Sequence, residues 1–121
     1  MILVVDDEPS IREITRATLE EHGYKTITAG DGAEGLALYV QNRKEIKAVI
    51  LDMMMPIMDG SATIRVLRKI DPQVKVIAVS GLKDKSESAR ASGNDVSAFL
   101  QKPYKAETLL RILREVLSAK Q

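Results

Sequence analysis

The sequence predicts an α/β fold in which a parallel β-sheet of five strands carries helices on both faces. Five strand-length apolar runs, mostly of β-branched residues and Leu, alternate with stretches of helical periodicity, and the connections between them are short. This repeated strand–helix order is typical of a doubly wound sheet. A chain of 121 residues has the length of one ordinary domain, so we expect residues 1–121 to form a single domain.

The five predicted strands differ in how deeply they should be buried. The runs at residues 2–5, 48–51 and 76–79 are the most continuously apolar, which indicates strands with a neighbour on each side. The run at 27–29 is flanked and interrupted by Thr, and the run at 98–100 is very short, so both suit sheet edges. Edges formed by the second and fifth strands fit the strand order 2-1-3-4-5 of flavodoxin-like folds.

Amphipathic stretches follow each of the strands. The first is expected to end at Gly23, a favourable C-cap. Further helices are expected at about 33–43, 61–70 and 84–92, the last of them poor in apolar residues, and a fifth begins after Pro103. Right-handed crossovers would place the first and fifth helices on one face of the sheet and the others on the opposite face. The residues expected to form the apolar faces of the first and fifth helices are Ile11, Ile14, Thr18, Leu19, Leu109, Leu110, Leu113, Val116 and Leu117.

Composition excludes several classes of function. A net charge of +1 and 3% aromatic residues argue against direct nucleic-acid binding through a basic surface or stacking platform. The absence of Cys excludes disulfides, thiolate metal sites and Cys nucleophiles, and a single His, His22, excludes a His-based zinc site. No apolar run approaches the ~20 residues that a bilayer requires, so we expect no membrane insertion and a cytoplasmic location.

Acidic residues follow two of the predicted central strands. Asp6 and Asp7 come after the first strand, and Asp52 ends the third. Ligands of doubly wound sheets bind beyond the carboxyl ends of the strands where the strand order reverses, which here lies between these two strands. One such acid is more often a solvated loop residue or a helix cap. Three together repel one another unless a cation is present, and oxygen ligands alone favour a hard divalent ion such as Mg²⁺.

Two further polar residues end or follow the remaining strands. Ser80 ends the fourth strand, and Lys102 follows the fifth. Alone, such a Ser is usually a turn residue and such a Lys a solvated surface charge. Beside the carboxylates, however, a hydroxyl and an ammonium complete the groups needed for phosphoryl transfer to a carboxylate, a reaction in which positioning and charge neutralisation supply most of the catalysis.

Four motifs on these elements resemble one known family. They lie at residues 2–8 (ILVVDDE), 51–60 (LD, then MPIMDG from residue 55), 79–81 (VSG) and 99–103 (FLQKP). In this order they resemble the receiver domain of two-component response regulators, and the resemblance covers nearly the whole chain. It implies a domain that accepts a phosphoryl group from a histidine kinase or a histidine phosphotransfer protein and acts on no separate substrate. If the chain is a piece of a hybrid sensor, the parent protein would be a histidine kinase.

The resemblance also implies a role for individual residues. Asp52 would be the phosphoacceptor. Asp7 and Asp52 would ligate Mg²⁺ (or Mn²⁺) directly, Asp6 through a water molecule, and the main-chain carbonyl of Met54 would be a further ligand. Lys102 would pair with the acceptor carboxylate before transfer and with the phosphoryl oxygens afterwards.

Ser80 and Phe99 would form the switch that reports phosphorylation. The Ser80 hydroxyl would bind a phosphoryl oxygen, and the Phe99 ring would turn inward, so that the surface of the fourth helix, fifth strand and fifth helix changes shape. Ile112 lies at the edge of the last helix's apolar stripe, and this surface is a candidate for a phosphorylation-dependent homodimer. The resemblance also implies a cis bond before Pro103.

Three alternatives accompany this interpretation. Residues 30–35 (GDGAEG) match a dinucleotide-binding fingerprint, but they follow a predicted edge strand, so a capped helix start is the better explanation. An aspartyl-phosphate phosphatase of the haloacid dehalogenase type needs a second Asp two residues after the first, where this chain has Met54. A degenerate receiver that binds partners without phosphorylation is the remaining alternative.

Overall fold

The computed structural model describes residues 1–55, 59–81 and 96–119. The strands are β1 Ile2–Val5, β2 Thr26–Ala29, β3 Ala48–Asp52, β4 Val76–Ser80 and β5 Ala98–Gln101. The helices are α1 Pro9–Glu21, α2 Gly32–Gln41, α3 Gly60–Ile70 and α5 Ala106–Ser118.

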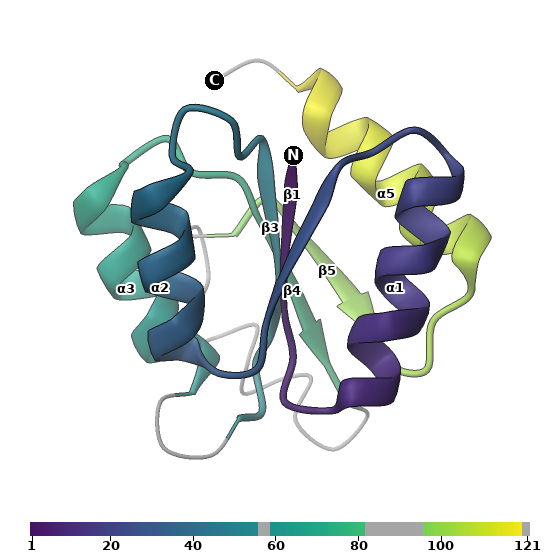
Figure 1. The fold of residues 1–121 in the computed structure, drawn as a ribbon, viewed down its shortest axis with the longest axis horizontal. Helices are drawn as coiled ribbons and strands as arrows, with labels where there is room; N and C mark the ends of the chain where they lie inside the picture. Colours follow the sequence, from purple (N-terminus) through teal and green to yellow (C-terminus); the bar gives the residue numbers. More distant parts are fainter. Residues whose placement is uncertain (56–58, 82–95, 120–121) are drawn as a thin grey trace.

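The five strands form a parallel sheet with the order β2-β1-β3-β4-β5. Helices α2 and α3 cover one face of the sheet, and α1 and α5 cover the other (Figure 1). The predicted strand order and the placement of these helices are therefore confirmed, whereas the helix expected at about 84–92 lies outside the described residues.

The sheet core has two sides that follow the alternation of side chains along each strand. All residues of β1, β3 and β4 are buried, as expected for strands with a neighbour on each side. Leu3 and Val5 of β1 pack toward α2 and α3, and Ile2 and Val4 pack toward α1 and α5. From the helices, the first side receives Tyr39, Ile64 and Leu67, and the second receives Leu19, Leu109, Leu113 and Val116.

Helix α1 is rotated relative to the prediction. The apolar pattern predicts Ile14 on the packed face, but this residue is 64% exposed, and Thr15 is buried instead. Thr15 and Leu19 are one helical turn apart and face the sheet together, which turns Ile14 outward. The expected end of the helix is confirmed, because Gly23 has φ 87° and its N–H bonds to the carbonyl of Glu20.

Residues 30–35 form a capped helix start. Asp31 is the N-cap of α2, and its side chain accepts the N–H of Glu34 at 2.8 Å. Gly35 permits the close approach of α2 to β1, because a Cβ at this position would lie 2.9 Å from Val5 Cγ2. The third glycine in this segment is thus needed for helix–sheet packing, and the segment follows the edge strand β2.

The register brings the carboxyl ends of four strands to one edge of the sheet. Asp52 pairs with Val79 and Ser80 with Gln101, while Asp6 follows directly after β1. The carboxyl ends of the strands lie at the lower end of the sheet in Figure 1. None of the helices in the described part of the chain is both long and apolar enough to span a membrane.

Candidate functional site

Three of the predicted site residues are polar side chains buried at this edge of the sheet. Asp6, Asp52 and Ser80 are 4%, 3% and 3% exposed. Asp7 is exposed and makes no hydrogen bond or ion pair with any residue that the structure describes. Burying two carboxylates is costly unless they are paired, so the site depends on the cations that face them.

Lys102 supplies the positive charge of the site. Its Nζ lies 3.0 Å from Asp6 Oδ2, 3.3 Å from Asp52 Oδ2 and 3.3 Å from Glu8 Oε1. The main-chain N–H of Lys102 donates to the Ser80 carbonyl at 2.8 Å, which ties the segment after β5 to the end of β4. The bond between Lys102 and Pro103 is cis, as expected. One ammonium is therefore shared by carboxylates from two strand ends and from the start of α1.

Asp6 and Asp52 have the same local geometry. Asp6 Oδ1 accepts the N–H of Glu8 at 2.9 Å, and Asp52 Oδ1 accepts the N–H of Met54 at 3.0 Å. In both, the side chain binds the main chain two residues on, as in an Asx turn. Because one oxygen of each carboxylate is held in this way, the other oxygen of each is directed at Lys102.

The same contacts set the charge states of Asp52 and Lys102. Burial raises the pKa of Asp52 to about 6, and the negative charge of Asp6 acts in the same direction, against the opposing effects of the Met54 N–H and Lys102. Burial alone would lower the pKa of Lys102, but its hydrogen bond to Asp6 and the charge of Asp52 outweigh burial and raise it. The ammonium thus stays charged while Asp52 titrates close to neutrality.

Glu8 belongs to the acidic group of the site, although it is not among the residues predicted from the sequence. Carboxylate oxygens of Asp6, Asp7 and Glu8 lie within 4.8 Å of one another. Glu8 is the N-cap residue of α1, and no side-chain capping bond uses its carboxylate. Its position directly after Asp6 and Asp7 was the available signal. Asp52 is linked to this group through Lys102.

A second missed residue supports the main chain of the acidic segment. Arg12, on the first turns of α1, donates from Nη1 to the carbonyl oxygen of Asp6 at 2.6 Å. Helical spacing places Arg12 one turn after Glu8, but a bond to a main-chain carbonyl leaves no sequence pattern. The bond fixes the point at which β1 ends and the carboxylates begin.

Two predicted residues at the rim of the site are exposed. Met54 is 54% exposed, and its main chain lies next to Asp52. Phe99, on the edge strand β5, is 42% exposed, so its ring faces outward in this structure. Gly60 packs closely against the residue that follows Asp52, because a Cβ there would lie 2.6 Å from the Cα of Met53.

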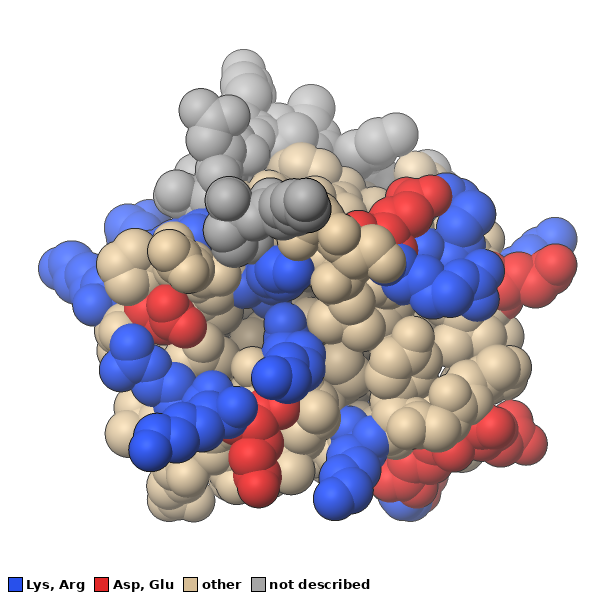
Figure 2. All heavy atoms as spheres, turned by 90° about the horizontal axis from the view of Figure 1, so that it is seen from above, with Lys and Arg blue, Asp and Glu red and all other residues tan. Residues whose placement is uncertain are grey.

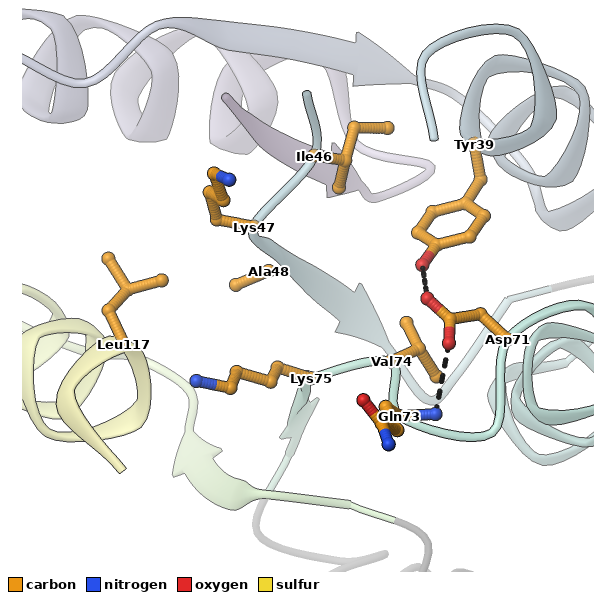
Figure 3. Close-up of a pocket in the computed structure, with 9 residues that line it drawn as sticks. All are labelled: Tyr39, Ile46, Lys47, Ala48, Asp71, Gln73, Val74, Lys75 and Leu117. Atoms are coloured by element: carbon orange, nitrogen blue, oxygen red, sulfur yellow. Dashed lines mark hydrogen bonds between the residues drawn. The ribbon is translucent and has the colours of Figure 1, made fainter. Parts of the chain in front are cut away.

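The opposite edge of the sheet holds a separate cavity of about 430 Å³. Tyr39 donates to Asp71 Oδ2 at 2.9 Å on one side of it, and Lys47 and Lys75, which directly precede β3 and β4, also line it (Figure 3). Lys and Arg side chains also gather near the middle of this face (Figure 2). The cavity lies at the amino ends of the strands, so it is not part of the carboxylate site.

Comparisons with known proteins identify the family. The family model of the response regulator receiver domain matches residues 2–114. Among solved structures, a response regulator receiver domain protein from Clostridium thermocellum is 33% identical with a TM-score of 0.90, covering 96% of this chain and 92% of that one. The receiver domain of NtrX from Brucella abortus is 30% identical with a TM-score of 0.90, covering 99% of this chain and 100% of that one.

Curated relatives agree. Response regulator MprA of Mycobacterium sp. (strain KMS) is 39% identical over 118 residues, which are 96% of this chain and 50% of the relative. The probable transcriptional regulator ycf27 of Porphyridium aerugineum is 38% identical over 96% of this chain and 47% of its own length. The chain thus spans about half the length of these relatives. From its fold, its motifs and these matches, the chain belongs to the family of response regulator receiver domains.

Proposed function

We propose that the chain is the phosphoacceptor domain of a two-component phosphorelay and that Asp52 receives the phosphoryl group. The donor is the phosphohistidine of a histidine kinase or of a histidine phosphotransfer protein. The P–N bond of the donor breaks, a P–O bond to the Asp52 carboxylate forms, and the imidazole leaves. The observation that carries the proposal is the buried Asp52 carboxylate with Lys102 Nζ at 3.3 Å.

Lys102 and Ser80 receive the charge of the transferred group. A phosphoryl group adds about −1.5 to −2 charge and three strong acceptor oxygens. Lys102 Nζ already lies among the carboxylates and can exchange a carboxylate oxygen for a phosphoryl oxygen. The Ser80 hydroxyl, at the end of the neighbouring strand, donates to another phosphoryl oxygen. Donors that are in place before charge develops give the largest electrostatic gain.

The donor atoms at the site suit Mg²⁺ or Mn²⁺. The expected ligands are Asp6, Asp7, Asp52 and the main-chain carbonyl of Met54, and every one offers oxygen. Glu8 joins them because its carboxylate lies within 4.8 Å of Asp6 and Asp7. Asp7 and Glu8 are both exposed, but only Asp7 has no competing partner among the described residues. When bound, the ion supplies neutralisation of the negative charge on the transferring group.

Phosphorylation then acts through Ser80 and Phe99. Movement of the Ser80 segment toward the phosphoryl group makes room for the Phe99 ring, which is 42% exposed here and turns inward. The surface of β5, α5 and the helix expected at 84–92 changes shape, and a homodimer forms through it on phosphorylation. In this proposal residues 1–121 make up one domain, which controls whatever output part accompanies it in the intact protein.

The decisive experiment is incubation with phosphoramidate and Mg²⁺ followed by intact-mass measurement. We expect wild type to gain ~80 Da, one added phosphoryl group, and Asp52→Asn to gain nothing. Equal adducts on both proteins would move the acceptor elsewhere. A wild-type protein that gains no mass, and whose spectrum does not respond to beryllofluoride with Mg²⁺, would be the degenerate receiver instead.

A further inference from the structure

A hydrogen bond between two hydroxyl groups joins α1 to the segment that carries Lys102. Thr15 Oγ1 and Tyr104 Oη lie 2.8 Å apart, although 89 positions separate the two residues in sequence. Thr15 is 2% exposed, and within the described ranges Tyr104 is the one hydrogen-bond partner of its hydroxyl, so loss of the Tyr104 hydroxyl would leave a buried polar group unpaired there. The bond lies beside a cavity of about 400 Å³ that opens between α1 and residues 102–104.

We propose that Thr15 and Tyr104 are positioning residues for phosphoryl transfer: their hydrogen bond sets the place of the Lys102 ammonium relative to the carboxylates. The proposal rests on the proposed phosphoacceptor role of Asp52 and adds to it two residues that do not touch the reacting atoms. It concerns the geometry of the transition state and not the binding of the phosphoryl donor.

The Lys102 segment is anchored differently on its two sides. On its amino-terminal side, the N–H of Lys102 bonds to the carbonyl of Ser80 at 2.8 Å, which fixes it to β4. On its carboxyl-terminal side, α5 begins only at Ala106. Tyr104 lies between these two anchors, two residues after Lys102. Its bond to Thr15 therefore holds the part of the segment that the sheet does not hold.

The other end of the bond lies on the helix that follows the acidic residues. Thr15 belongs to α1, and α1 begins directly after Asp6, Asp7 and Glu8. Lys102 Nζ contacts Asp6 Oδ2 at 3.0 Å and Glu8 Oε1 at 3.3 Å. The Thr15–Tyr104 bond thus connects α1, which follows the acidic residues, with the segment that follows Lys102. A displacement of one relative to the other changes both ion-pair distances.

The Tyr104 hydroxyl is chemically suited to this bond. Burial raises its pKa, so the group keeps its proton throughout the neutral range. A neutral hydroxyl is a stable partner for Thr15 and adds no charge to the acidic site. Phe at this position would keep the ring packing and lose only the bond, which makes Tyr104→Phe a clean test. Thr15→Val is the matching change on α1, because Val has the shape of Thr without the hydroxyl.

The experiment measures phosphorylation of the 121-residue chain by phosphoramidate and Mg²⁺, with intact mass as the readout. We expect Tyr104→Phe and Thr15→Val each to lower the maximal rate by roughly three- to tenfold, because small misplacements of a positioned group are costly. The half-saturating donor concentration should change less than twofold. The double variant should be no slower than either single variant, since all three lack the same bond. Thr15→Ser, which keeps a hydroxyl, should stay close to wild type.

Tyr39→Phe is the matched control, because it removes a Tyr hydroxyl bond of 2.9 Å at the far edge of the same sheet. We expect it to leave the maximal rate unchanged. Wild-type rates in Tyr104→Phe and Thr15→Val, an additive double variant, or an equal loss in Tyr39→Phe would overturn the positioning role. If wild type itself gains no phosphoryl mass, or gains it equally in Asp52→Asn, the proposed function fails and this role falls with it. A failure of the positioning role alone can therefore be distinguished from a failure of the proposed function.

Discussion

Lys102 Nζ lies closer to Asp6 than to the proposed acceptor Asp52, at 3.0 Å against 3.3 Å. The ammonium is therefore a shared counter-charge for the whole carboxylate group and not a private partner of one residue. The surrounding carboxylates hold the ammonium in place, and there it competes with any divalent cation for the same oxygens. The position of Lys102 thus has opposite effects on metal affinity and on phosphoryl transfer.

We predict that Lys102→Met separates these two effects. Loss of the ammonium should lower the phosphorylation rate by roughly 10²- to 10³-fold, the usual cost of removing one group that stabilises charge in a transition state. The same change should tighten Mg²⁺ binding by roughly three- to tenfold, because a competing cation is gone and the carboxylates remain. Intact mass over time and calorimetric Mg²⁺ titration measure the two quantities.

Lys105→Met serves as the control for Lys102→Met. Lys105 is exposed, three residues along the chain, and forms no ion pair with the described residues. We expect wild-type Mg²⁺ affinity and phosphorylation in this variant. Weaker Mg²⁺ binding by Lys102→Met than by wild type would show that the ammonium does not compete with the metal. The proposed role of Lys102 as a shared counter-charge would then be wrong.

A second prediction concerns the cost of ionising Asp52. Its pKa is raised to about 6, so the folded state holds this proton more tightly than the unfolded chain does. The resulting stabilisation is complete below about pH 4 and is lost as the pH rises through 6. At pH 8 without Mg²⁺, Asp52→Asn should therefore be more stable than wild type by about 1–3 kcal/mol, and at pH 4 the difference should vanish.

Urea unfolding followed by circular dichroism measures this difference. Addition of Mg²⁺ should stabilise wild type more than Asp52→Asn, because the variant lacks one ligand and its charge. Asp31→Asn is the control, since Asn also caps a helix and the stability should stay within about 0.5 kcal/mol of wild type at both pH values. A wild-type protein as stable as Asp52→Asn at pH 8 would contradict the proposed cost of burial.

The strand order and the site edge could be predicted because they depend on local patterns. Continuous apolar runs identified β1, β3 and β4 as the buried strands, and parallel order alone sends Asp6, Asp52 and Ser80 to one edge of the sheet. Lys102 could be placed there by the same rule, since it follows β5.

The contacts that tune the site could not be predicted in this way. Apolar periodicity favoured Ile14 for the packed face of α1, but packing against the rest of the fold selected the polar Thr15. That rotation produces the bond to Tyr104, which joins residues far apart in sequence. Arg12 binds a main-chain carbonyl, an acceptor that every residue offers, so no residue pattern marks its partner. Side-chain pairs of this kind depend on tertiary geometry, so the sequence shows the residue types but not which residues pair.

The third prediction is that Gly60 cannot be replaced. A Cβ at this position would lie 2.6 Å from the Cα of Met53, and main chain cannot move aside as a flexible side chain can. Gly60→Ala should therefore cost about 2 kcal/mol or more of unfolding free energy and displace the segment that follows Asp52. Gly81→Ala, where no atom of residues 1–55, 59–81 or 96–119 outside its chain neighbours lies within 4 Å of the added Cβ, should stay within about 0.5 kcal/mol of wild type. Equal stability of the two variants, measured by thermal unfolding, would rule out close packing at Gly60.

The last prediction concerns stability in alkaline solution and the far edge of the sheet. Burial raises the pKa of Tyr39 to about 12, and the hydrogen bond to Asp71 adds to this effect. The unfolded chain releases this proton near pH 10, before the folded state does, so the unfolding free energy falls as the pH rises from 10 through 12. Tyr39→Phe has no proton to lose there. At pH 7 the unfolding free energy of Tyr39→Phe should be about 1 kcal/mol lower than that of wild type, because one hydrogen bond is lost. Between pH 9 and pH 11.5 wild type should lose about 1–2 kcal/mol relative to Tyr39→Phe, so the difference should shrink or reverse. Unfolding at matched pH values tests this, and parallel pH profiles of wild type and Tyr39→Phe would show that Tyr39 ionises as readily in the folded protein as in the unfolded chain.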